Sequence, residues 1–377
     1  MHRVTRSEVA KRARVSNTTV SYVLSGRTDV SIQEETRRRV LQAAADLDYV
    51  PNLVARALKT GQTNIIGLWM SVLCPVYYSR VIEVVQSKVM ESGYELTVTA
   101  TSHHVNPKEH LERLMQWPVD GIIAFDSSFY VNEYVSRYSK RRVPIVSMGV
   151  DVSPGVDAVR VDLYPGAAQA VRHLIALGRT RIAFLGDRYG LATEDGRMQA
   201  YQRLMVQAGL DLEIIPCLKR SRASSHEAVC RYVSANGHPG ALFCYNDDLA
   251  IGAQRALLDL GLKMPDDVAV VGHDGIEDIE FTEPRLSSVV VPTSQMCEVA
   301  WRLLRTRLSD TSLPVQNESV ETFLRISRSS GGTEYDPPLP LSESEGRPLQ
   351  ITCFPSKTTS KRTSDNESSQ EKCVHAD

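Results

Sequence analysis

The sequence contains no apolar run of the roughly 18 residues that a membrane-spanning helix needs. Residues 1–26 alternate charged and short apolar side chains and have no signal-peptide core, so we expect a cytoplasmic protein that does not associate with membranes. Cysteine is sparse, with 7 scattered residues that are odd in number and form no close pair. This pattern is typical of a reducing compartment rather than of a disulfide framework.

Motifs that carry common enzyme chemistry are also missing. There is no glycine-rich phosphate loop of either usual spacing, no nucleophile elbow and no paired-histidine zinc motif. His103, His104 and His110 form the only histidine cluster, in a polar stretch where solvated side chains are favoured over a metal site. The adjacent Asp247 and Asp248 are expected at a helix start rather than as an acid–base pair. The sequence therefore predicts neither an enzyme nor a bound cofactor.

What is present is a chain of 377 residues, long enough for two or three domains, with 42% apolar residues to build their cores. Its net charge of −2 conceals an asymmetry, because residues 1–60 hold eleven basic and six acidic side chains. A small basic unit joined to an acidic remainder indicates a polyanionic partner for the N-terminus alone.

Three helix-start signals follow one another in the first fifty residues. Thr5 and Ser31 are each followed three positions later by a glutamate, which is the capping-box spacing, and Ser16 can cap a helix that begins at Asn17. Each predicted helix has an apolar face; the three faces comprise Val9, Ala10 and Ala13, then Val20, Val23 and Leu24, then Val40, Leu41, Ala44 and Leu47. Because so few residues remain for the first turn, the pattern predicts a helix-turn-helix.

From residue 64 to about 330, apolar runs alternate with amphipathic stretches. The predicted strands are 65–70, 95–100, 121–125, 144–148, 181–185, 214–218, 241–245 and 268–272, and the predicted helices are 79–92, 107–117, 167–177, 197–208, 225–235 and 249–260. A glycine follows four of these helices, at positions 93, 178, 209 and 261, where a left-handed cap is needed. Two consecutive βαβ series predict two parallel-sheet lobes with a ligand cleft between them.

These patterns divide the chain into four parts. We expect a helix-turn-helix unit at 1–51, a hinge and linker at 52–62, and a core at 63–330 whose lobes span about 63–161 and 162–291 before the chain crosses back. Residues 331–377 are rich in Ser, Thr, Pro, Glu and Lys, and are expected to form a disordered tail.

The same residues resemble the LacI/GalR family of bacterial transcription regulators. The resemblance is carried by VTRSEVAKRARVSNTTVSYVLSG, VSIQEETRRRVLQAAADLDYVPNLVARALKTG and TNIIGL, and later by HLIALGRTRIAFLGD, CYNDDLAIGAQRALLDLGLKMPDDVAVVGHD and EPRLSSVVVP. It implies a helix-turn-helix headpiece and a periplasmic-binding-protein-like core of two Rossmann-like lobes, in a homodimeric repressor of a near-palindromic operator. It also implies control by a small molecule bound between the lobes.

For the headpiece, the resemblance implies a recognition helix in the major groove. Asn17, Thr18 and Tyr22 match base-reading positions, and hydroxyls suited to phosphate come from Thr5, Ser16, Thr19 and Ser21. Family members often have Gly or Asn where this chain has Arg14, and some have a guanine-reading arginine where it has Tyr22. A phenol cannot make that bidentate contact, so a different half-site is expected.

Residues 52–59 resemble the family's hinge helix, which folds on DNA as a pair in the minor groove. The positions that carry this role are Asn52, Ala55 and Leu58, with Leu58 as the side chain wedged between base steps. The alternative is an ordinary linker in which Leu58 packs on the core.

For the core, the resemblance implies that effector-binding positions are Tyr77, Tyr78, Arg197, Asn246 and Asp274. Asn246 or Asp274 could instead cap the following helix. Several family features are absent: Gly149 replaces a frequent aspartate, 218–229 lacks an aromatic residue, and Val290 and Val291 replace a polar pair. A sugar is the expected effector, while a nucleoside, an organic acid or no ligand stay open. A sugar-binding transport component would share the core but would carry an export signal and no DNA-binding unit. No apolar C-terminal heptad is present, so a dimer is expected rather than a tetramer.

Overall fold

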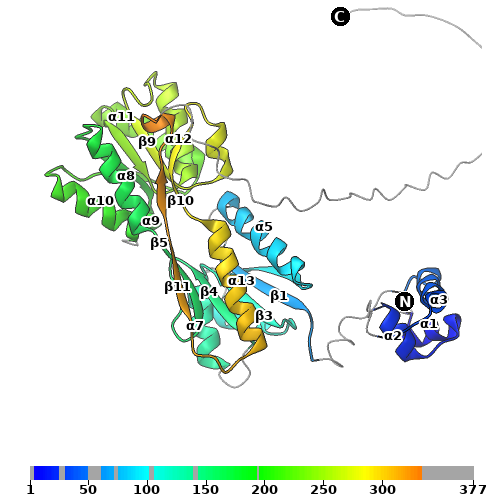
Figure 1. Cartoon of the computed structure of the whole chain (residues 1–377). Helices are drawn as coiled ribbons and strands as arrows, with labels where there is room; N and C mark the ends of the chain where they lie inside the picture. The colour runs from blue at the N-terminus through cyan, green and yellow to red at the C-terminus, as the bar shows by residue number, and fades with distance from the viewer. Residues whose placement is uncertain are drawn as a thin grey trace, which may run out of the picture. The chain divides into compact units, whose positions relative to one another are not determined.

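The computed structural model describes residues 4–24, 30–49, 61–71, 75–101, 106–138, 143–192 and 195–332. Within these ranges no helix combines the length and the apolar character needed to cross a lipid bilayer. The α/β class with an N-terminal helix-turn-helix and two parallel-sheet lobes is confirmed (Figure 1).

The described residues 4–24 and 30–49, here called the headpiece, form three helices around a small apolar core. The helices are α1 (Arg6–Ala13), α2 (Asn17–Leu24) and α3 (Glu34–Asp46), and their buried side chains are Val9, Ala10, Ala13, Val20, Val23, Val40, Ala43 and Ala44. Two expectations are wrong. Leu41 is 49% exposed, because it lies about 100° around the helix from Val40, and α3 is preceded by Gln33 as its N-cap rather than by Ser31.

Local hydrogen bonds fix the start of α1 and the turn between α1 and α2. The Glu8 carboxylate accepts from the backbone N–H and the hydroxyl of Thr5, at 2.7 and 2.8 Å, which closes the predicted capping box. Ser16 accepts from the backbone N–H of Thr19 at 3.1 Å and thereby caps α2. Arg14 lies between the two helices with φ 52° and ψ 50°, so the left-handed turn is made without glycine.

The first lobe is built on a six-stranded sheet of order β11-β5-β4-β3-β1-β2, all parallel. Helices α5 and α13 pack on one face, and α6 and α7 pack on the other. The bounds are β1 Ile65–Ser71, α5 Pro75–Glu91, β2 Glu95–Thr101, α6 Pro107–Leu114, β3 Gly121–Phe125, α7 Ser128–Arg137, β4 Ile145–Gly149, β5 Asp157–Asp162, α13 Thr293–Ser309 and β11 Asn317–Glu321.

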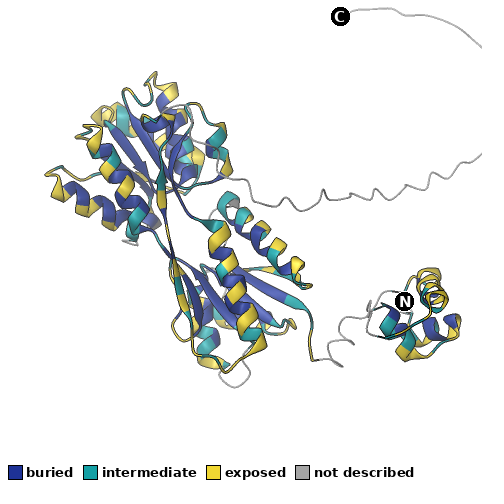
Figure 2. Ribbon diagram, viewed as in Figure 1, coloured by how far each residue is buried: buried dark blue, intermediate teal, exposed yellow. Residues whose placement is uncertain are grey.

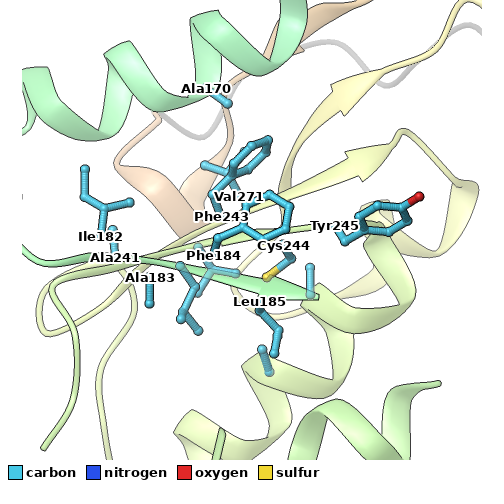
Figure 3. Packing of buried hydrophobic residues seen from close by; sticks show 14 of the residues in the cluster. Ala170, Ile182, Ala183, Phe184, Leu185, Ala241, Phe243, Cys244, Tyr245 and Val271 are labelled. Atoms are coloured by element: carbon cyan, nitrogen blue, oxygen red, sulfur yellow. The ribbon is translucent and has the colours of Figure 1, made fainter. Parts of the chain in front are cut away.

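The second lobe repeats the plan with order β12-β10-β9-β8-β6-β7, in which only β12 is antiparallel to its neighbour. Its core includes Phe184 and Phe243, whose ring centroids are 5.5 Å apart (Figure 3). Strand interiors are buried and outer helix faces are exposed (Figure 2). The bounds are α8 Tyr164–Ala176, β6 Ile182–Asp187, α9 Arg188–Ala192, α10 Gly196–Gln207, β7 Glu213–Cys217, α11 Arg222–Asn236, β8 Ala241–Cys244, α12 Asp247–Asp259, β9 Ala269–Asp274, η1 Glu277–Phe281, β10 Ser287–Val290, β12 Phe323–Arg325 and η2 Arg328–Ser330.

Within the ranges that the structure describes, the chain passes between the lobes three times. The passages lie between β5 and α8, between β10 and α13, and between β11 and β12. The first and third are joined by hydrogen bonds, because Thr322 donates its backbone N–H to the Asp162 carbonyl at 3.1 Å and accepts from Gly166 at 3.2 Å. The first and third passages therefore lie side by side.

The helix-terminating glycines have the predicted conformation. Gly93, Gly178, Gly209 and Gly261 hold φ of 79°, 75°, 67° and 72°. No element was predicted from the sequence for α7, β5, α9, β10, α13, β11 or β12. For α13 the signal was available, since Met296, Ala300, Leu303 and Leu304 repeat at helical spacing and are all buried.

Candidate functional site

Two polar side chains lie on the exposed first turn of α2. Asn17 and Thr18 are exposed, and Tyr22 lies one turn further along, half-buried. Asn17 donates from its side-chain amide to the Ser7 hydroxyl at 3.3 Å. These side chains share the helix that a helix-turn-helix presents to the major groove.

Three of the four predicted phosphate-contacting hydroxyls already have partners within the headpiece. Thr5 bonds Glu8, and Ser16 and Thr19 bond each other at 2.9 Å between their hydroxyl oxygens. Ser21 is half-buried. The hinge positions Asn52, Ala55 and Leu58 lie outside the described residues.

A cavity of about 510 Å³ lies between the two lobes. All five predicted effector-binding side chains line it, namely Tyr77, Tyr78, Arg197, Asn246 and Asp274. Its volume is in the range of small-molecule sites, and its position outside the carboxyl ends of parallel strands is where α/β sheets place their ligands.

The first-lobe wall of the cavity is aromatic. Tyr77 and Tyr78, in the first turn of α5, lie with their ring centroids 6.0 and 5.1 Å from that of Phe125. The Tyr78 hydroxyl donates to Asp126 at 3.1 Å. These rings offer flat apolar faces against which a sugar or base could stack.

The second-lobe wall is formed by an arginine held rigidly. Arg197, near the start of α10, pairs with Asp195 at 2.5 Å, donates to the Tyr245 carbonyl at 3.0 Å and stacks over the Tyr245 ring. Burial alone would raise the pKa of Asp195, but the charge and hydrogen bonds of Arg197 outweigh it, and the pKa lies below its usual value. Arg220, paired with Asp187 at 3.1 Å, lies over the same ring at 4.4 Å.

Asn246 lies just after β8 and Asp274 is the last residue of β9, but they differ in local role. Asn246 caps α12 by accepting from the backbone N–H of Leu249 at 3.0 Å, so the capping alternative holds for this residue alongside its place in the cavity. Asp274 caps no helix; its carboxylate lies 3.1 Å from His273 Nδ1. Burial lowers the pKa of His273, so this ring stays neutral beside Asp274 at pH 7.

Asp247 and Asp248 are the first residues of α12 and bind different partners, as expected for a helix start. The buried Asp247 accepts from the backbone N–H groups of Gly275 and Ile276 at 2.7 and 3.0 Å and from the Ser288 hydroxyl at 2.7 Å. It thereby fixes the loop that follows Asp274. Asp248 pairs with Arg222 at 2.7 Å instead.

Asp126 is a cavity residue that the sequence reasoning missed. It follows β3 directly, holds φ 46°, and accepts from the Val150 backbone N–H at 3.2 Å as well as from Tyr78. Burial raises its pKa to about 6, although the bonds from Val150 and Tyr78 and the charge of Arg197 act in the opposite direction. The rule that singled out Asn246 and Asp274, a polar residue just after a strand, applies equally to Asp126.

Tyr245, Asp195 and Arg220 also line the cavity and were not predicted. Arg220 lies in the stretch 218–229 that lacks an aromatic residue, and it covers Tyr245. Val291, from the pair noted in the sequence, lines the cavity with an apolar side chain.

A metal site is not apparent in the described ranges, where no three His, Cys, Asp or Glu side chains converge. His110 lies 3.1 Å from the Tyr130 hydroxyl through Nδ1, while His103 and His104 lie outside these ranges. Cys217, Cys230, Cys244 and Cys297 are free thiols.

Comparison with known proteins gives two family matches. The model described as bacterial regulatory proteins, lacI family, matches residues 5–52, and the periplasmic binding protein-like domain matches residues 171–330. HTH-type transcriptional repressor PurR of Serratia proteamaculans is 31% identical over 307 residues, covering 80% of this chain and 89% of the relative. PurR of Vibrio vulnificus is 30% identical over 308 residues, covering 80% and 91%. The crystal structure of the Lac repressor bound to ONPG in the repressed state aligns with a TM-score of 0.72 at 25% identity, covering 87% of this chain and all of that one.

Proposed function

Because this chain belongs to the lacI family and is a DNA-binding repressor controlled by a small molecule, we propose that its effector occupies the cavity between the lobes. The observation that carries this assignment is the convergence of five side chains from four separate parts of the chain, Tyr77, Tyr78, Arg197, Asn246 and Asp274, on one cavity of about 510 Å³. The aromatic wall would stack on a ring, and the arginine, amide and carboxylate would bind its hydroxyl or amide groups.

The headpiece would read DNA through α2. Asn17 and Thr18, exposed on its first turn, would contact base edges together with Tyr22, and the hydroxyls of Thr5, Ser16, Thr19 and Ser21 would set the register on phosphates. Two copies would bind a near-palindromic operator as a homodimer in the cytoplasm, with residues 52–62 as the hinge between headpiece and core. We assign the chain no catalytic role.

Control would follow from unequal binding to two states of the cavity. A molecule that prefers one state shifts the population toward it, and the headpieces change their operator affinity accordingly. A sugar or sugar derivative is our first candidate and a nucleoside the second, since both combine a ring face with hydroxyl groups.

The operator test begins with selection of binding sites from random duplexes, followed by fluorescence anisotropy with the full chain. We expect Asn17→Ala and Thr18→Ala each to weaken binding to the selected site by about tenfold or more while leaving non-specific DNA binding nearly unchanged. Gln42→Ala, on the exposed side of α3, is the matched control and should bind as the wild type does. Absence of any preferred duplex would refute the assignment.

The effector test uses Asn246→Ser. Serine retains N-capping ability, so α12 should keep its stability while the amide is lost from the cavity. We expect operator affinity without effector to be unchanged, and the response to cellobiose, ribose, adenosine or a bacterial metabolite extract to be weakened. An undiminished response in this variant would argue that Asn246 serves only as a helix cap.

A further inference from the structure

Gly149 leaves the space into which the Asp126 side chain fits. A Cβ at position 149 would lie 2.1 Å from Asp126 Oδ1, and Gly149 itself holds φ 129°, a conformation that side-chain-bearing residues rarely adopt. β3 and β4 are neighbours in the sheet, with Phe125 paired to Met148. The carboxylate at this sheet edge therefore comes from the end of β3, over a glycine at the end of β4.

Asp126 has acceptor capacity left after its internal hydrogen bonds. A carboxylate offers about four acceptor positions, and the described contacts use one on each oxygen, from Val150 N–H and from Tyr78. Both donors are neutral groups of the first lobe. Since Asp126 lines the cavity, the remaining positions are available to a donor on a bound molecule.

The cavity as a whole has an excess of carboxylates. Two of its arginines, Arg197 and Arg220, are already paired with Asp195 and Asp187. The charged side chains that remain among its lining residues are Asp126, Asp151, Asp162 and Asp274 against Arg160. An anion entering this space would meet uncompensated negative charge, whereas a hydroxyl, amine or ring N–H would meet acceptors.

We propose that Asp126 is a specificity-determining residue: it accepts a hydrogen bond from a hydroxyl or N–H group of an uncharged or positively charged effector, and the cavity rejects anionic molecules. The inference rests on the proposed function, since it requires an effector in this cavity. It narrows the candidates to neutral sugars, nucleosides and amines, and removes organic acids and phosphorylated compounds.

Burial of an ionisable group beside aromatic rings supports a role in binding. Burial raises the pKa of Asp126 to about 6, which means that the folded chain holds its charged form at neutral pH at a cost in stability. Such a cost is typical of residues kept for function rather than for folding.

The experiment compares the thermal stability of the full chain in matched compound pairs that differ by one anionic group. The pairs are cellobiose and cellobionate, ribose and ribose 5-phosphate, and adenosine and AMP; a bacterial metabolite extract, split by anion exchange into unretained and retained fractions, widens the range. We expect any stabilisation to come from a neutral member or from the unretained fraction. Stabilisation by an anionic member or by the retained fraction alone would overturn the proposal.

Two variants then test Asp126 with the probe that stabilises the wild type. Asp126→Asn should weaken its apparent affinity by about tenfold, because a neutral amide oxygen replaces the charged acceptor. Glu133→Gln, on α7 of the same lobe and paired with Arg137, removes the same charge elsewhere and should leave the affinity unchanged. An equal thermal-stability response to the probe in Asp126→Asn and in the wild type would refute this inference without affecting the proposed function. A wild type that responds to no probe or fraction would contradict both.

A double-mutant cycle distinguishes an effect of Gly149 on the position of the Asp126 carboxylate from a general effect on the fold. Gly149→Ala should displace the Asp126 carboxylate and weaken binding in the wild type, but should have no further effect on binding in an Asp126→Ala background. The backbone strain of an alanine at 149 is present in both backgrounds, so it cancels. Equal losses in the two backgrounds would show that Gly149 acts independently of Asp126, contrary to the proposal.

Discussion

The Arg197 guanidinium carbon lies 3.6 Å from the centroid of the Tyr245 ring, and the same guanidinium donates to the Tyr245 backbone carbonyl. One residue is thus held by the ring, the carbonyl and, on its other side, the carboxylate of Asp195. Arg197 is both a wall of the cavity and a tie between α10 and the end of β8.

Loss of this arginine should destabilise the second lobe. We expect Arg197→Ala to lower the free energy of unfolding by about 3–5 kcal/mol, because the Asp195 carboxylate, whose side chain is only 11% exposed, would lose its partner. Chemical denaturation of the full chain measures the change. Arg255→Ala, which breaks an exposed pair with Asp259 on α12, is the control and should have little effect. Similar losses in both variants would mean that the Arg197–Asp195 pair stabilises the fold no more than an exposed ion pair does.

Asp126 should make stability depend on pH. Its pKa of about 6 in the folded chain exceeds the ordinary 3.8, so the folded state binds more protons in that interval and stability falls as pH rises from about 4 to 6. Asp126→Asn removes this loss and should be more stable than the wild type at pH 7.5, by up to about 3 kcal/mol, with no advantage at pH 4. Tyr78, Arg197 and Asp151 are the titratable or charged groups acting on Asp126, and all remain in the variant.

Thermal melts of wild type and Asp126→Asn across this pH range provide the measurement. Glu133→Gln should show no comparable pH-dependent gain. If Asp126→Asn is less stable than the wild type at pH 7.5, Asp126 contributes to folding rather than opposing it.

The turn of the headpiece should tolerate glycine at position 14. Arg14 has φ 52°, a region in which a residue with a side chain costs about 1–2 kcal/mol. Glycine avoids this cost but loses more conformational entropy on folding, so the net gain in stability is smaller. Arg14→Gly should therefore stabilise α1 and α2 by about 0.5–1 kcal/mol, seen as slower amide hydrogen exchange in the full chain. Lys11→Gly, inside α1, should do the opposite by about 1 kcal/mol. Faster exchange in Arg14→Gly would contradict a strained turn.

The assignment of Leu58 to a minor-groove hinge predicts an effect on specific DNA binding. Leu58→Ala should weaken binding to the selected operator by about tenfold or more, because the wedge that kinks the duplex is lost, and should change non-specific binding little. Leu53→Ala removes the same side chain from the same segment and is the control. An equal loss on specific and non-specific DNA would favour an ordinary linker.

Local signals account for most of what the sequence predicted. Helix ends were readable because Gly93, Gly178, Gly209 and Gly261 adopt the left-handed conformation that a helix terminus requires. Strand ends placed Asn246 and Asp274 at the cavity, since the carboxyl ends of parallel strands meet on one edge.

What could not be predicted depends on contacts between distant segments. That Asp126 fills the space above Gly149 follows from the adjacency of β3 and β4, which no local pattern encodes. The stacking of Arg197 and Arg220 on Tyr245 likewise joins the start of α10, the loop after β7 and the end of β8. Predicting that α13 and β11 return to the first lobe requires knowledge of the strand order, although the apolar repeat of α13 indicates the helix itself.

The three passages of the chain between lobes restrict how the cavity can open. Since Thr322 ties the third passage to Asp162 and Gly166 at the first, neither can bend without the other. We therefore expect the cavity to open by a rotation of one lobe about the linked passages, in which the cavity side chains of that lobe move together. A molecule that bridges Tyr78 of the first lobe and Arg197 of the second would therefore hold the two lobes at one fixed angle.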